Sequence, residues 1–274
     1  EFIETFCKQA EGEIGKPIKL ELFQKAYIQA LFGFVYRDTG LRRFNETMFL
    51  VGRKNGKTTL LSAIALYMMI ADGEGSAECY SVATKKDQAS KAFKSACAMR
   101  AQSPEIRAII SKRRTDMYMP STFSSFEPLS SDSDTLDGLN SHLVIIDELH
   151  AIKDRNLYEV MKQSTSSRRQ PLVVMITTAG TVRECIFDDI YTYANNVLNG
   201  TIKNDSFLPV LYELDKVDEW KDIKCWQKAN PGLGTIKQYK YLNEQVQRAK
   251  DDLSSKNGIL CKDFNIRGTS EEKW

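Results

Sequence analysis

One segment restricts the possible folds of this chain more than any other. An apolar stretch, Met48–Val51, runs into a short polar turn and then into Gly56-Lys57-Thr58, which opens a second apolar stretch reaching Ala71. The first stretch is typical of a buried strand and the second of a buried helix. A polar turn at a helix N-terminus presents backbone N–H groups and positive potential to an anion. The segment therefore predicts a phosphate-binding loop in an α/β fold.

Residues of this loop would have separate roles on a nucleotide. Lys57 is expected to reach the β- and γ-phosphates, and the Thr58 hydroxyl to bind Mg²⁺. The match to the pattern GxxxxGK[ST] is imperfect, because Val51 occupies the position of the first glycine. Taken alone, the segment has an ordinary strand-to-helix connection as its alternative. The candidate nucleotide-binding residues are Gly52, Arg53, Lys54, Asn55, Gly56, Lys57, Thr58 and Thr59.

A second motif lies about ninety residues further on, where the apolar run Leu143–Ile146 ends in Asp147 and Glu148. Ligands of α/β sheets bind at the carboxyl ends of the strands, and this pattern places both acids there. Asp147 would hold Mg²⁺ and Glu148 would orient and deprotonate the attacking water. An acidic pair in a solvated turn is the alternative for this motif alone. The two motifs together, in this order, predict a P-loop ATPase that uses ATP and Mg²⁺.

Two weaker signals fit the same interpretation. A third apolar run ends in Thr177, Thr178, Ala179 and Gly180, and hydroxyls at a strand end can sense a γ-phosphate. Upstream, the Gln24 amide could recognise the edge of adenine and Phe23 could stack on the base. By themselves, these segments are more often a turn and the start of an amphipathic helix.

The pattern along the chain predicts an α/β P-loop fold of the RecA-like class, with a mostly parallel central sheet flanked by helices. Expected strands are 48–51, 79–83, 143–146, 172–177 and 207–211, and expected helices are 58–71, 86–102, 156–167 and 183–198. Short strands at 117–119 and 122–126 interrupt this alternation. From residue 215 onward, the helical periodicity of 216–228 and 238–257 predicts a small helical subdomain. The expected domains are thus 1–214, the ATPase core, and 215–274.

Charge and composition exclude several classes of protein. The net charge of +2 and the 27% of charged residues are those of an ordinary globular chain rather than a polycation. The longest nearly apolar run, 60–71, is too short to span a bilayer. Six scattered cysteines indicate free thiols in a reducing compartment. Charge is nevertheless segregated, with a net of +7 over residues 85–114 and −7 over 115–159; paired, solvated faces are the simplest explanation.

Taken together, the motifs resemble the large terminase subunit of tailed bacteriophages, over nearly the whole chain from Phe2 to Trp274. The segments that carry the resemblance are Leu22–Gln24, Gly52–Thr58, Leu136–Asn140, Ile146–His150, Thr177–Gly180 and Ala229–Pro231. That family tolerates a residue other than glycine at the first loop position, so Val51 is expected. It also carries an arginine four residues before the lysine, here Arg53.

The resemblance implies functions that the motifs alone do not. It implies an ATPase domain that drives double-stranded DNA into a procapsid, with a portal protein and a small terminase subunit as partners. A ring of copies on the portal, in the host cell cytoplasm and without a membrane, is implied as well. Gln24 would read adenine, Arg53 and Lys57 would act in catalysis with Glu148, and Thr177, Thr178 and Gly180 would couple hydrolysis to movement. A second arginine, acting on a neighbouring subunit, stays open among Arg100, Arg107, Arg113 and Arg114.

The chain reads as a piece of a longer protein, and we expect the family's nuclease domain to begin beyond it, so that this chain does not cleave DNA. Two other interpretations are a fragment of a DExH-type helicase and an inactive P-loop module for DNA binding or assembly. The helicase interpretation requires a second strand–helix series after Thr181, which the sequence does not show. The intact Lys57, Thr58, Asp147 and Glu148 argue against an inactive module.

Overall fold

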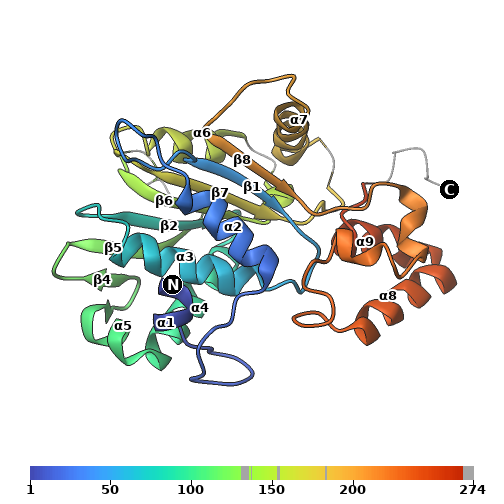
Figure 1. Ribbon diagram of the computed structural model, residues 1–274, viewed down its shortest axis with the longest axis horizontal. Helices are drawn as coiled ribbons and strands as arrows, with labels where there is room; N and C mark the ends of the chain where they lie inside the picture. Colours follow the sequence, from blue (N-terminus) through green and yellow to red (C-terminus); the bar gives the residue numbers. More distant parts are fainter. Residues whose placement is uncertain (131–135, 137, 153–154, 183, 268–274) are drawn as a thin grey trace. The chain divides into compact units, whose positions relative to one another are not determined.

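The computed structural model of the 274-residue chain describes residues 1–130, 136, 138–152, 155–182 and 184–267 (Figure 1). Its α-helices are α1 (Phe2–Phe6), α2 (Leu22–Gly33), α3 (Lys57–Ile70), α4 (Lys86–Gln102), α5 (Pro104–Ile109), α6 (Arg155–Gln163), α7 (Ile186–Leu198), α8 (Tyr239–Asp251) and α9 (Leu253–Asp263). The strands are β1 (Glu46–Leu50), β2 (Glu78–Ala83), β3 (Ser111–Lys112), β4 (Met117–Met119), β5 (Ser124–Ser130), β6 (Ser141–Asp147), β7 (Leu172–Thr177) and β8 (Phe207–Leu211). Short 3₁₀ turns cover Leu149–Ala151, Val217–Lys221 and Trp226–Lys228.

These elements form two compact units. The first consists of residues 1–46, 57–147 and 155–174, and the second of residues 47–56, 148–154 and 175–274. The chain passes between the units at the start of β1, before α3, after β6, before α6 and within β7.

The first unit contains strands in the order β3-β4-β5-β2-β6, followed by the first half of β7. Strand β2 pairs in parallel with both β5 and β6, so that Cys79 lies between Phe126 and Leu143. Strands β3, β4 and β5 form an antiparallel excursion at one edge. Helices α3 and α4 pack against each other and against β2 and β5 (Figure 1).

Burial explains why these segments become strands of a central sheet. Every residue of β6 is buried, as are five of the six residues of β2. Strands of a parallel sheet are covered on both faces, which requires continuous apolar runs rather than alternation. Helix α3 is apolar nearly all round, with nine of its 14 residues buried, because it packs against the strands as well as against α4 and α1.

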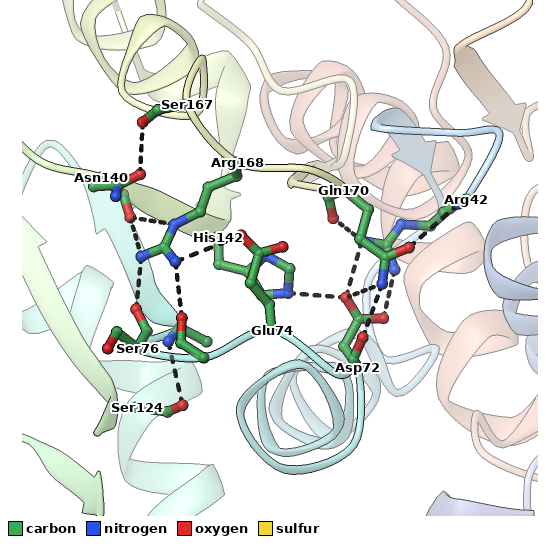
Figure 2. Close-up of polar contacts among 12 residues, drawn as sticks. Arg42, Asp72, Glu74, Ser76, Ser124, Asn140, His142, Ser167, Arg168 and Gln170 are labelled. Carbon is green, nitrogen blue, oxygen red and sulfur yellow. Dashed lines mark hydrogen bonds and ion pairs between the residues drawn. The ribbon is translucent and has the colours of Figure 1, made fainter. Parts of the chain in front are cut away.

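A buried polar network joins the end of α3 to the starts of β6 and β7 (Figure 2). The Arg42 guanidinium donates to Asp72 Oδ1 at 2.7 Å, and His142 Nε2 lies 2.8 Å from Asp72 Oδ2. Arg168 pairs with Glu74 at 3.5 Å. Removing one partner of such a buried pair costs about 3–5 kcal/mol, so the network fixes the amino ends of these strands. The candidate site residues follow the carboxyl ends instead.

The second unit contains the last half of β7, then β1 and β8. Val51 N–H donates to Thr177 O at 3.2 Å, and Tyr212 N–H donates to Leu50 O at 2.8 Å. A separate apolar cluster lies within residues 214–266 and includes Trp220, Trp226 and Phe264. Helices α8 and α9 pack against each other in this region.

The predicted α/β fold with a mostly parallel sheet is confirmed, but the helical prediction for 216–228 is wrong. That segment forms two 3₁₀ turns, because side chains bond to local backbone: Glu219 accepts from Asp215 N–H at 3.0 Å, and Asp222 accepts from Lys224 N–H at 3.0 Å. The helix predicted for 238–257 is two helices. They break at Asp252, whose carboxylate caps α9 by accepting from Ser254 N–H.

Candidate active site

The loop from Gly52 to Gly56 connects β1 to α3, as the sequence predicted. Lys54 and Gly56 both adopt the left-handed conformation, with φ of 64° and 76°. Helix α3 begins at Lys57, immediately after the second of these turns. The loop therefore leads directly into a helix N-terminus, which is the backbone geometry that suits a phosphate group.

Gly52 allows the loop to approach another part of the second unit very closely. A Cβ atom at this position would lie 2.6 Å from Asn230 Oδ1 and 2.7 Å from Asp263 O. The N–H groups of Gly52 and Arg53 donate to Ala229 O at 3.0 Å and to Lys262 O at 2.8 Å. These two N–H groups are therefore committed to the protein, so any N–H donors to a phosphate would come from later in the loop and from the start of α3.

Asn55 is buried, with 1% of its surface exposed, and its side chain bonds within the protein. Its Nδ2 donates to Gly52 O at 2.8 Å and to Asn230 Oδ1 at 3.0 Å, while its Oδ1 accepts from Gly232 N–H at 3.0 Å. The sequence predicted Asn55 as a nucleotide contact. The side chain instead shapes the loop, which leaves the backbone N–H of Asn55 as the group for such a contact.

The other loop side chains differ in exposure. Arg53, Lys54, Thr58 and Thr59 are exposed, and Lys57 is half-buried. The exposed Arg53 and Thr58 side chains are thus accessible to a ligand that arrives from solvent.

The predicted adenine reader, Gln24, also has a local structural role. It is 4% exposed and lies in the first turn of α2, where its Oε1 accepts from Glu21 N–H at 3.0 Å. This bond is half of a capping box. The amide nitrogen and the second acceptor site of Oε1 would remain for recognition of adenine. Phe23 precedes it and is half-buried.

The two predicted acids are consecutive at the end of β6. Asp147 is the last residue of the strand and is 8% exposed. Glu148 has a left-handed backbone, with φ of 56°, and its N–H donates to Ile176 O at 2.9 Å. A positive φ at a residue other than glycine is strained and occurs where the surroundings impose it.

His150 is a site residue to which the sequence pattern gave no role. Its Nδ1 lies 3.2 Å from Glu148 Oε2 and 2.9 Å from Thr177 Oγ1. The Thr177 hydroxyl donates its own proton to Thr178 O at 2.7 Å, so it accepts from the His150 ring. His150 therefore connects the predicted base with the predicted coupling segment. In the sequence, only the position of His150 two residues after Glu148 indicated that it could belong to the site.

Gly180 makes room for that imidazole. A Cβ atom at this position would lie 2.2 Å from Cδ2 of the His150 ring, and the φ of +60° also favours glycine. Thr178 is 1% exposed, and within the described ranges its Oγ1 is buried with no hydrogen-bond partner. A buried hydroxyl in that state is a candidate donor to a bound ligand or water.

The arginines left open as candidates for action on a neighbour have different environments. Arg100 Nε donates to Ile110 O, and Arg113 lies over the Tyr118 ring at 3.5 Å. Arg107 and Arg114 are exposed. In the segment 136–140, which contributed to the resemblance, Asp137 lies outside the described residues.

The strand β1, the loop and helix α3 place the fold in the P-loop α/β class. A family model described as "Terminase large subunit, ATPase domain" matches residues 22–196. The chain belongs to this terminase large-subunit family, as the resemblance implied, and this assignment decides against the helicase interpretation.

Two curated relatives and two solved structures illustrate the similarity. Protein YmfN of Escherichia coli is 35% identical over 130 residues, which cover 47% of this chain and 29% of that protein. The large terminase subunit of Enterobacteria phage HK97 is 25% identical over 97% of this chain and 52% of its own length. The HK97 large terminase structure superposes with a TM-score of 0.84 at 23% identity, over 97% of this chain and 54% of that one. The ATPase domain from Thermus phage P74-26 gives 0.56 at 16% identity, over 86% and 95%.

The chain spans about half the length of the terminase relatives that it matches. A second family model, "Terminase large subunit, endonuclease domain", matches residues 201–274. We expected that domain to begin beyond this chain, whereas the match begins inside it, at a region with its own apolar cluster. Over the described ranges, no three His, Cys, Asp or Glu side chains are grouped as metal ligands, and no helix is long and apolar enough to cross a membrane.

Proposed function

We propose that this chain binds ATP and Mg²⁺, hydrolyses ATP, and uses the reaction to move double-stranded DNA into a procapsid. The observation that carries the proposal is the shape of the loop, in which two left-handed residues lead from β1 into the N-terminus of α3. Family membership gives this geometry its function, since the matching model is that of an ATPase domain.

The residues present fit a magnesium nucleotide. Lys57 would bind the β- and γ-phosphates at the start of α3. The Thr58 hydroxyl and the Asp147 carboxylate are oxygen donors of the kind that Mg²⁺ prefers. When bound, the metal supplies neutralisation of the charge that develops on the phosphate oxygens. Gln24 and Phe23 would bind the adenine.

Glu148 is the proposed general base. Its carboxylate would orient a water molecule and accept a proton from it. The His150 ring, whose Nδ1 lies 3.2 Å from Glu148 Oε2, would hold the carboxylate in place. The loss of the γ-phosphate would be sensed through Thr177, Thr178 and Gly180, because His150 contacts this segment as well as the base. Arg53 would stabilise the transition state.

Assembly and location are part of the same proposal. The partners would be double-stranded DNA, a portal protein and a small terminase subunit, with copies of this chain forming a ring on the portal. The site of action would be the host cell cytoplasm, transiently on the procapsid. We also propose residues 1–214 as the ATPase core and 215–274 as a helical subdomain.

The substitution Glu148→Gln tests this function. It keeps the shape of the side chain and removes the base, so we expect nucleotide binding to be retained and phosphate release to fall by about 10²–10⁴-fold. Steady-state release of phosphate with and without Mg²⁺ measures the effect. Glu244→Gln, an exposed position on α8, makes the same chemical change elsewhere and is expected to leave turnover unaltered. Normal turnover of Glu148→Gln would remove Glu148 from the mechanism.

A further inference from the structure

A buried ion pair lies beside the phosphate loop, in the second unit. Lys237 Nζ is 2.7 Å from Asp263 Oδ1, and the two side chains are 1% and 5% exposed. The same ammonium donates to Asn230 Oδ1 at 2.7 Å. Removing two charges from water costs several kcal/mol per ion, so a buried pair is weak evidence for added stability. Its position is more informative than its energy.

Asn230 connects this pair to the loop. Its Oδ1 accepts from Lys237 and from Asn55 Nδ2 at 3.0 Å. Its Nδ2 donates to Asp263 O at 2.8 Å and to Trp226 O at 3.2 Å. Two donors and two acceptors use the full capacity of an amide side chain, so only one orientation of Asn230 satisfies all four bonds.

Asn55 passes this constraint to the backbone of the loop. Its amide closes the turn by donating to Gly52 O, while its oxygen accepts from Gly232 N–H. Gly52 and Arg53 donate to the carbonyls of Ala229 and Lys262, which flank the same network. Apart from the local bond of Asn55 to Gly52 O, these contacts join residues 52–55 to residues 229–262, more than 170 positions later in the chain.

We propose that Lys237, Asp263 and Asn230 are positioning residues for the phosphate loop. They orient Asn55 and so hold the loop backbone in the shape that receives the phosphates. The inference rests on the proposed function, because it assumes that this loop binds ATP. It assigns control of nucleotide affinity to a region that the endonuclease-domain model matches.

The competing explanation is that the ion pair serves only the local fold of residues 214–266. The double substitution Lys237→Met/Asp263→Leu distinguishes a positioning role from a purely structural one. Replacing a buried pair by apolar side chains of similar volume is often neutral or stabilising, so the thermal midpoint should stay near that of the unaltered chain. Asn230 then lacks its ammonium donor and keeps its bonds to Asn55, Trp226 O and Asp263 O, so its amide is held less firmly.

The positioning role predicts two changes in this double variant. The Kd for ATPγS should rise about tenfold, and amide hydrogen exchange at Gly52 and Arg53 should become faster while that of α3 is unchanged. Lys228→Met is the matched control, since Lys228 is an exposed lysine of the same region paired with Asp215 and Glu219. It should alter neither measurement.

Asn55→Ala gives an independent test that leaves the ion pair intact. It should reproduce the weaker binding and faster exchange, and adding it to the double variant should cause little further loss, because both act through one network. If the double variant does not fold, Asn55→Ala alone decides.

Normal affinity and normal exchange in either folded variant would overturn the inference. If the unaltered chain binds no ATPγS, the proposed function fails instead, while exchange at Gly52 and Arg53 still tests the network.

Discussion

Arg53 is an exposed side chain in a loop whose backbone is otherwise fixed, and its N–H is already bonded to Lys262 O. Only the guanidinium can therefore act on a nucleotide. We expect Arg53→Ala to lower kcat by about 10³–10⁵-fold with little change in nucleotide affinity, because charge spreads over the phosphoryl oxygens in the transition state.

Stopped-flow nucleotide binding and steady-state turnover, measured on the assembled motor as well as the free chain, separate the two effects of this substitution. Arg53→Lys should rescue poorly, since an ammonium cannot bond two oxygens in a fork. Loss of affinity with an unchanged kcat would show that Arg53 acts on the bound ground state.

Gly180 and Gly200 form a natural comparison, because both have positive φ but different surroundings. A Cβ at Gly180 would overlap the His150 ring, whereas no described residue other than its chain neighbours lies within 4 Å of a Cβ at Gly200. Gly200→Ala should cost about 1–2 kcal/mol from backbone strain alone. Gly180→Ala should cost more and should also lower turnover, because His150 must move away from Glu148 and Thr177.

Chemical denaturation and phosphate release, measured on both glycine variants, check this prediction. Equal losses of stability, with turnover intact in both, would mean that the contact between Gly180 and His150 has no part in catalysis.

At this scale the sequence predicted residue types better than their partners. Lys57, Thr58, Asp147 and Glu148 were identified from local spacing, since the first two lie in a short turn between two apolar runs and the other two follow an apolar run directly. The partners of Asn55 and the contact of His150 with Gly180 depend on residues distant in sequence, and no local pattern contains them. Asn230 was noted only as part of a resemblance, without a role.

Among the elements, strand β5 contains Glu127, a carboxyl group whose charged form is destabilised by folding. Burial raises the pKa of Glu127 above its ordinary value of 4.5, and the nearby Asp116 and Glu78 raise it further. A raised pKa in the folded state means that protonation favours folding. This contribution is complete below pH 4.5 and is lost as the pH rises through the folded-state pKa.

Glu127→Gln should therefore be more stable than the unaltered chain at pH 7, and the difference should shrink as the pH falls toward 4. Thermal unfolding across this pH range measures it. Glu4→Gln should have the opposite effect on stability at pH 7, because hydrogen bonds from Lys25 and from Leu20 N–H lower the pKa of Glu4. A Glu127→Gln difference that grows on acidification would contradict the assignment.

The strands and helices of the α/β core were predictable because their burial is continuous. Strands β1, β6 and β7 are buried at every position, so their apolar runs were unambiguous. The segment 215–228 was not predictable in this way. Its charged residues have a helical period, but its two tryptophans are buried by turns that side chains of Glu219 and Asp222 hold.

At the scale of the whole molecule, the nearly neutral chain has one strongly basic segment, residues 85–114. Eight of its nine Lys and Arg side chains are exposed, and Arg100 is half-buried. We expect weak DNA binding without sequence preference through this segment, with an affinity that falls steeply as salt rises. Such binding would fit the proposed packaging function, which has to act on any DNA sequence.

The double substitution Lys91→Glu/Lys94→Glu on α4 should weaken DNA binding. It should also reduce the slope of log K against log salt by about two, if each lysine contacts one phosphate. Fluorescence anisotropy at several salt concentrations measures both. Lys240→Glu/Lys250→Glu makes the same change of charge at exposed positions on α8. An equal effect of the two pairs would show that only net charge matters.

The close approach at Gly52 has a consequence for anyone who wishes to shorten this protein. A cut after residue 214 would follow the boundary that sequence periodicity suggests. It would also remove the carbonyls of Ala229 and Lys262 that receive the N–H groups of Gly52 and Arg53, together with the Asn230 amide that holds Asn55. The smallest piece of this chain that retains a shaped phosphate loop therefore extends to about residue 263, although the loop itself is complete by residue 58.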